Sequence, residues 1–180
     1  MTKQILFVSI IAAALAVGCD DKSAATAQGT GGATANAAPA LPANLRLAAS
    51  PADAKEIAAV KSSVKDGDKI VVSGVVAGRG DPIAENRAIL TLLDTSVRTC
   101  DKNPDEGCKT PWDACCEPAD VLAKNSVTVQ VVDADGRPLK TSLAGVEGVK
   151  PLAKLVVSGT AKVSADGVVL VNADGLHVVQ

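Results

Sequence analysis

Hydrophobic positions along the chain follow two different spacings, which separate a helical segment from a region of strands. Ile57, Val60 and Val64 recur at helical spacing and predict a short amphipathic helix over residues 52–65. Ser50 stands just before this segment as a candidate N-cap, since its hydroxyl can accept a hydrogen bond from the first turn. The pattern therefore predicts one helix at the start of the folded part.

Beyond Lys69 the apolar residues, mostly valine, follow the spacing of strands and are separated by Asp-Gly turns. The Asp174-Gly175 pair falls inside the last apolar segment and predicts a bulge or a turn there. A stretch with sparse apolar residues and two glycines, residues 139–153, predicts a loop with one helical turn. The strands are predicted at 69–78, 87–95, 126–133, 154–163 and 167–179.

One internal repeat indicates how these strands assemble. The sequence KIVVSG at 69–74 recurs as KLVVSG at 154–159. Glycine in the middle of a strand is unfavourable unless the chain bends or another backbone approaches closely. Five strands, two of them bent at such glycines, predict a small closed barrel.

With these VVSG strands and the closing VVLVNADGLHV stretch, residues 69–179 resemble the OB-fold, a five-stranded Greek-key barrel. The likeness extends to exported bacterial lipoproteins with OB-fold domains. The expected fold class is therefore all-β with one N-terminal helix. A β-sandwich is the alternative, for which five strands are few.

The N-terminal segment has the features of an export signal. Residues 1–18 combine one lysine with an apolar run from Ile5 to Val17, which is too short for a membrane-spanning helix. The run ends in Ala16-Val17-Gly18-Cys19, which resembles the bacterial lipobox, although Ala16 stands where leucine is commoner. The resemblance implies lipidation of Cys19; cleavage nearby by an ordinary signal peptidase is the alternative.

Residues 19–48 are rich in Ala, Gly, Thr and Pro and lack apolar periodicity, so they predict a disordered tether before a folded domain at 49–180. We expect the domain to be anchored by lipid in the cell envelope, facing the periplasm or the exterior. The whole chain carries −2, and residues 1–18 contribute one positive charge, so the remainder carries −3. An acidic domain has no electrostatic attraction to nucleic acid.

Four cysteines lie close together in the loop predicted at residues 98–120, between the second and third strands. Export places Cys100, Cys108, Cys115 and Cys116 in an oxidising compartment, where disulfides persist. Neighbouring Cα atoms are ~3.8 Å apart, whereas unstrained disulfides need ~4.4–6.8 Å, so a bond between the adjacent pair would be strained and is not expected. Two pairings stay open: Cys100–Cys115 with Cys108–Cys116, or Cys100–Cys116 with Cys108–Cys115.

Metal binding and redox chemistry are the alternatives for these cysteines. Zinc sites usually draw their thiolates from Cys-x2-4-Cys hooks, whereas here seven, six and zero residues intervene. The one histidine, His177, lies on the last predicted strand. Asp101 begins a segment like an EF-hand loop, but its twelfth residue is Trp112 and not glutamate. No Cys-x-x-Cys redox motif is present, so we expect structural disulfides and neither metal nor cofactor.

Trp112 is the only aromatic residue beyond Phe7, and with Asp113 it stands just before the adjacent cysteines. Exposed tryptophan often anchors a partner at an interface, so we treat these two residues as a candidate contact for a protein or glycan. Packing of the indole over the loop is the other interpretation.

The composition argues against two functional classes. Single-stranded nucleic acid is bound on several aromatic platforms in a basic groove, and this chain has one candidate aromatic residue and an acidic balance. An enzyme would need its nucleophile or base near the lone His177. The sequence therefore predicts a non-enzymatic binding or scaffold module. The alternatives are an OB-fold protein for nucleic acid or oligosaccharide, and an envelope protein that binds Zn, Cu or Ca through the cysteine loop.

Overall fold

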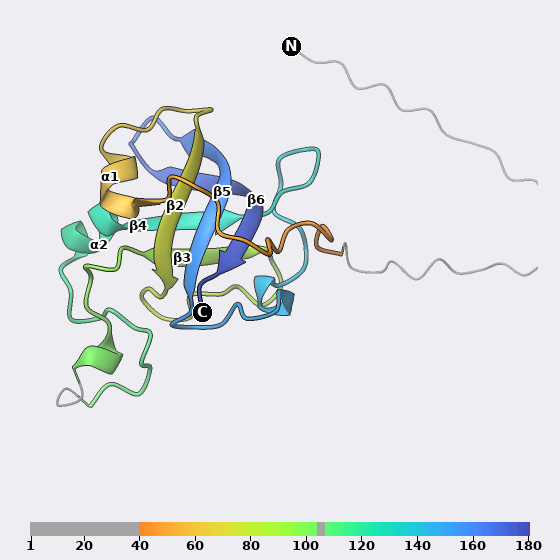
Figure 1. Cartoon of the computed structure of the whole chain (residues 1–180). Coiled ribbons are helices and arrows are strands. Elements are labelled where there is room, and N and C mark those ends of the chain that lie inside the picture. Colours follow the sequence, from red (N-terminus) through yellow and green to blue (C-terminus); the bar gives the residue numbers. More distant parts are fainter. Residues whose placement is uncertain (1–39, 104–106) are drawn as a thin grey trace, which may run out of the picture. The chain divides into compact units, whose positions relative to one another are not determined.

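A computed structural model describes residues 40–103 and 107–180, which form a closed five-stranded mixed β-barrel with two short α-helices (Figure 1). The predicted signal peptide, the lipidation of Cys19 and most of the tether lie outside these residues. All five predicted barrel strands are present: β2 (Lys69–Val76), β3 (Ile89–Leu93), β4 (Ser126–Gln130), β5 (Lys154–Val163) and β6 (Val169–Val178).

The strands follow the order β2-β3-β4-β6-β5, and the pairing of β5 with β2 closes the barrel. That closing pair is antiparallel and runs from Lys69↔Thr160 to Val75↔Lys154. The β4–β6 pair is parallel, so the barrel is mixed. A two-residue strand, β1 (Lys55–Glu56), adds to β2 in parallel. The predicted barrel is confirmed, and the strands do not form the alternative β-sandwich.

The repeated mid-strand glycines lie where backbones approach each other, as the sequence predicted. A Cβ at Gly74 would be 2.7 Å from the Leu93 carbonyl oxygen, and one at Gly159 would be 2.3 Å from that of Asn172. Only glycine fits at such distances. The pairing of β5 with β6 shifts between Ser158 and Gly159, leaving Asp174 as the additional residue of a bulge.

The barrel interior is filled with branched aliphatic side chains. Alternate residues of β4, Val127 and Val129, point inward, while their polar neighbours are half-buried. Leu90, Leu155 and Leu176 are also buried in this core. Burying these side chains supplies the main stabilisation of the fold.

The N-terminal helix is much shorter than predicted: α1 spans Ile57–Lys61 and not residues 52–65. Asp53 has a φ of 59°, outside the helical region, and Lys55–Glu56 pair with β2 instead. The helix is capped from a distance, because the Ala58 amide donates to Asp94 Oδ2 at 3.1 Å. The pairing of Lys55–Glu56 with β2 thus moves the start of the helix beyond the position that the local sequence predicted.

A second helix, α2 (Ala119–Asn125), was not predicted. None of its side chains is fully buried, so its sequence ADVLAKN carries no apolar stripe to reveal it. In the loop before β5, a 3-10 turn at Leu143–Gly145 supplies the single helical turn that was expected.

The segment before α1 lies against the barrel. Leu45 is 2% exposed and joins the core. The amide of Leu47 donates to the Leu176 carbonyl at 2.8 Å, and the Leu176 amide donates to the Leu45 carbonyl at 2.7 Å. The sequence alone had placed these residues in the tether. Among the described residues, none of the helices has the length and hydrophobicity to cross a membrane.

Candidate functional site

The cysteines lie in the long connection between β3 and β4, which projects from one side of the barrel and is drawn in green in Figure 1. This connection begins with a short 3-10 helix, Cys100–Lys102, and ends in α2. Its middle is attached to the barrel at Gly78, whose amide donates to Trp112 and whose carbonyl accepts from Ala114, both at 3.2 Å. The loop therefore has a fixed base on the end of β2.

Backbone hydrogen bonds fold the loop back on itself. The Cys100 amide donates to the Asp113 carbonyl at 2.7 Å, and the Asp101 amide donates to the Pro111 carbonyl at 2.9 Å. The 3-10 helix is thereby held beside the segment that leads into Cys115. This pairing brings cysteines that are distant in sequence to the same place.

Four sulfur atoms converge around Cys115, and we call Cys100, Cys108, Cys115 and Cys116 the cysteine cluster. The Cys115 sulfur lies 3.6 Å from that of Cys100, 3.8 Å from that of Cys108 and 3.7 Å from that of Cys116. The sulfurs of Cys100, Cys108 and Cys115 all lie within 4.8 Å of one another. Cys100 is buried, Cys108 is half-buried, and the adjacent pair is exposed. The cluster is thus accessible from solvent.

None of the sulfur pairs in the described cluster is at the ~2.05 Å of a disulfide bond, so the disulfides predicted for this loop are not formed in the structure. The spacing resembles that of ligands around one ion. With Zn–S bonds of about 2.3 Å, tetrahedral geometry places neighbouring sulfurs about 3.8 Å apart. The three measured contacts lie close to this value.

Contacts within the cluster make its thiols unequal. The hydrogen bond with the Cys108 thiol, together with burial and the contact with Cys115, raises the pKa of Cys100 to about 12. Hydrogen bonds from the thiols of Cys100, Cys116 and Cys108 lower the pKa of Cys115. The pKa of Cys108 is raised as well, so of these three thiols only Cys115 has a lowered pKa.

Trp112 contacts the barrel from the base of the loop. Its indole is half-buried, and its Nε1–H donates to the Gly80 carbonyl at 3.0 Å. It packs against a small apolar group that is separate from the barrel core. This position corresponds to the packing interpretation, while a contact with a partner stays a prediction. The apolar group consists of Ala77, Leu93, Val97 and Ala114.

Asp113 carries an unsatisfied buried atom. Its Oδ2 accepts from the Thr110 hydroxyl at 3.5 Å, but its Oδ1 is buried without a hydrogen-bond partner among the described residues. A buried carboxylate oxygen with no partner is costly unless another positive or donor group is present. Sequence reasoning named Asp113 for its neighbour Trp112, and no sequence signal indicated this buried oxygen.

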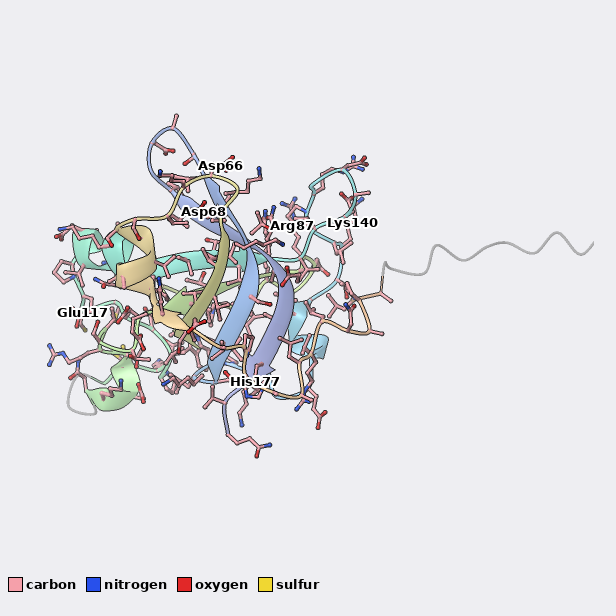
Figure 2. The ribbon with its side chains drawn as sticks, turned by 45° about the horizontal axis from the view of Figure 1, so that its top comes forward. Asp66, Asp68, Arg87, Glu117, Lys140 and His177 are labelled. Atoms are coloured by element: carbon pink, nitrogen blue, oxygen red, sulfur yellow. The ribbon has the colours of Figure 1, made fainter. Side chains whose placement is uncertain are left out.

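One hydrogen bond and one ion pair hold the end of the loop at Glu117. Glu117 accepts from the Arg79 side chain at its backbone carbonyl, 2.9 Å away, and its carboxylate lies 3.5 Å from Arg98. Figure 2 shows Glu117 on the side of the molecule that carries the loop, whereas His177 lies apart from it on β6. His177 is instead bonded to the Leu47 carbonyl at 3.1 Å. The histidine is therefore no ligand for the cysteine cluster.

Asp101, the first residue of the segment like an EF-hand loop, accepts a hydrogen bond from the Thr99 hydroxyl beside it, and the calcium alternative stays a prediction. Residues 104–106 of that segment lie outside the described residues. Elsewhere, a polar group on the barrel surface joins Asp174 to the Ser158 hydroxyl at 2.7 Å and to Lys69 Nζ at 3.1 Å. These bonds satisfy the bulged residue and account for the group structurally.

Comparisons of this chain with protein-family models, with curated proteins and with solved structures found no match.

Proposed function

We propose that this protein is an exported, lipid-anchored and non-enzymatic module that binds a thiophilic metal ion through its cysteine cluster. The observation that carries the proposal is the convergence of the Cys100, Cys108 and Cys115 sulfurs within 4.8 Å of one another. Thiolates are the ligands that select zinc and Cu(I) in proteins. The module would hold such an ion at the tip of the loop, outside the barrel.

The spacing of the sulfurs supports one shared ion. Cys115 contacts the other three sulfurs at 3.6–3.8 Å, close to the edge of a tetrahedral thiolate site. Three thiolates with the fourth position open to solvent or to another group are also the ligand number of catalytic or exchanging zinc sites. The sequence argued against zinc because it lacks the Cys-x2-4-Cys pairs that usually bring thiolates together. In this loop the fold brings them together instead.

Two disulfides in the same loop are the competing proposal, as the exported compartment favours them. The 3.6 Å contact between the Cys100 and Cys115 sulfurs favours the pairing that joins these two residues. That pairing requires Cys108 to join Cys116. A metal-loaded and a doubly crosslinked loop are mutually exclusive, because both use the same sulfurs.

The envelope location and the lipid anchor rest on the sequence. The lipobox-like Ala16-Val17-Gly18-Cys19 supports acylation of Cys19, and the composition of residues 19–39 supports a spacer between the membrane and the domain. The domain would then face the periplasm or the exterior and meet metal ions there.

The proposed likeness to the OB-fold is supported by the closed five-stranded barrel with one parallel pair. A nucleic-acid function gains nothing from this likeness, since a fold does not imply a function. Trp112 is the single aromatic side chain within the described residues, and it packs against the barrel. Stacking platforms for bases are therefore lacking in that part of the chain.

Elemental analysis of the full chain decides between metal and disulfides. The protein would be purified from membranes in detergent without oxygen or chelator, and its metal content and number of alkylatable thiols measured. We expect about one thiophilic ion per chain, lost in Cys100→Ser and kept in the control Thr110→Ser, which preserves the loop hydroxyl. A metal-free chain whose mass is lowered by four hydrogens would refute the metal proposal and establish the two disulfides.

A further inference from the structure

We propose that Asp113 makes the cysteine cluster prefer a divalent over a monovalent thiophilic ion. The inference rests on the proposed metal function and adds to it the charge of the ion and the residue that selects it. Zn²⁺ and Cu(I) both bind thiolates, so three sulfurs alone do not discriminate strongly between them. A further negative charge held beside the sulfurs would.

The Asp113 side chain has one oxygen without a hydrogen-bond partner among the described residues. Its Oδ2 faces the Thr110 hydroxyl, whereas Oδ1 is buried and unsatisfied among the described residues. No lysine or arginine forms an ion pair with this carboxylate in the described part of the chain. A buried carboxylate oxygen without a donor is unfavourable, and a cation held in the cluster would reduce that cost through its charge.

Backbone hydrogen bonding holds Asp113 beside Cys100. The Asp113 carbonyl accepts from the Cys100 amide at 2.7 Å, and Asp113 precedes Cys115 by two residues. Hydrogen bonds from the neighbouring thiols lower the pKa of Cys115, and the charge of Asp113 acts in the opposite direction. The Asp113 backbone is thus held next to Cys100 and two residues from Cys115, the two cysteines whose sulfurs are 3.6 Å apart.

The carboxylate acts from outside the first ring of ligands. The described ligand atoms that lie within 4.8 Å of one another are three sulfurs, and no Asp113 oxygen belongs to that group. Asp113 is therefore a positioning and charge-setting residue, comparable to the outer partners that tune other metal sites. Removing such a partner typically weakens metal binding by about 10–100-fold.

The charge of the ion gives the proposal a distinctive signature. The Coulomb attraction between one carboxylate and an ion is proportional to the charge of that ion. Loss of the Asp113 charge should therefore change the free energy of binding twice as much for a divalent as for a monovalent ion. A loss of about 10–100-fold for the divalent ion corresponds to about 3–10-fold for the monovalent ion.

The test compares Cd²⁺ and Ag⁺ as probes on the full chain in detergent, reduced and freed of metal. Binding is followed through the fluorescence of Trp112, the only tryptophan, and through the thiolate charge-transfer absorption. Asp113→Asn removes the charge, and Asp113→Glu keeps it. The matched control Asp120→Asn removes an equal charge from an exposed position on α2. Asp113→Ser replaces Asp113→Asn if circular dichroism shows that the latter is unfolded.

We expect Asp113→Asn to weaken Cd²⁺ binding about 10–100-fold and Ag⁺ binding about 3–10-fold, with Asp113→Glu and Asp120→Asn close to the native affinities. Unchanged Cd²⁺ binding, or equal losses for both ions, overturns the role of Asp113 while leaving the metal function intact. A native chain that binds neither ion overturns the proposed function itself, and the role of Asp113 with it.

Discussion

Replacing Trp112 with alanine removes the contacts that fix the base of the cysteine loop to the barrel. The indole Nε1–H donates to the Gly80 carbonyl at 3.0 Å, and the ring packs against the small apolar group that includes Leu93 and Val97. The neighbouring backbone bonds to Gly78 remain in the variant. The substitution therefore tests the side chain alone.

The expected cost follows from these two contributions. A hydrogen bond of this type contributes about 1 kcal/mol. Truncation of a fully buried tryptophan costs about 3–5 kcal/mol, so the packing of the half-buried Trp112 ring should contribute roughly 1–2 kcal/mol. We expect Trp112→Ala to lower the free energy of unfolding by about 2–3 kcal/mol. Trp112→Phe loses the hydrogen bond but keeps most of the packing, and should cost about 1 kcal/mol.

Urea unfolding followed by far-ultraviolet circular dichroism measures both variants, since the tryptophan itself is changed. The corresponding fall in midpoint temperature for Trp112→Ala is about 5–10 °C. Native stability in Trp112→Ala would refute the packing argument and restore the exposed contact with a partner. Equal losses in the alanine and phenylalanine variants would show that the hydrogen bond, and not the ring, carries the effect.

Three further changes test the barrel by thermal unfolding. Gly159→Ala should lower the free energy of unfolding by about 1–3 kcal/mol or more, because its Cβ would be 2.3 Å from the Asn172 carbonyl oxygen. The control Gly145→Ala meets no atom within 4 Å and should leave stability unchanged or slightly raised. Equal effects of the two substitutions would contradict the close approach at Gly159. Leu45→Ala should cost about 2–5 kcal/mol because Leu45 is 2% exposed, and a native midpoint would place it outside the core. Burial raises the pKa of Asp94, but hydrogen bonds from Ser96 and from the start of α1 outweigh burial and lower it. The Asp94 carboxylate therefore stabilises the fold above about pH 4, and this stabilisation is lost as the pH falls. The Asp94→Asn variant should be less stable than the native protein at neutral pH, and its stability should depend less on acid pH. An unchanged dependence of stability on acid pH would contradict this role.

The barrel was predictable because its signals are local and repeated. Alternating apolar residues and Asp-Gly turns located each strand, and the two VVSG glycines indicated close backbone contacts that the structure confirms at Gly74 and Gly159. The predicted start of the helix was wrong because the true start depends on residues distant in sequence. Lys55–Glu56 pair with β2, and Asp94 caps the helix from β3's end, 36 residues from Ala58. A short stretch of sequence around the helix therefore does not contain the residues that pair with it and cap it.

The cysteine cluster shows a similar limit. The sequence gathered the four cysteines into one loop, but their spacing offered no hook that would aim two sulfurs at one ion. The fold supplies the convergence by another route, the backbone bonds that join Cys100 to Asp113 and Asp101 to Pro111. The buried Oδ1 of Asp113 was equally hidden, because its burial depends on how the loop folds back.

The packing of the barrel interior indicates where a ligand can bind. Branched side chains such as Val129 and Leu176 fill the barrel interior, so a ligand inside it would have to displace core residues. We therefore expect a ligand to bind at the connections, and the β3–β4 loop holds the one group of side chains among the described residues that could ligate a metal ion. Because Cys100 is already held against Cys115, little conformational entropy is lost when an ion binds. A loosened loop base, as in Trp112→Ala, should then weaken metal binding even though Trp112 is no ligand.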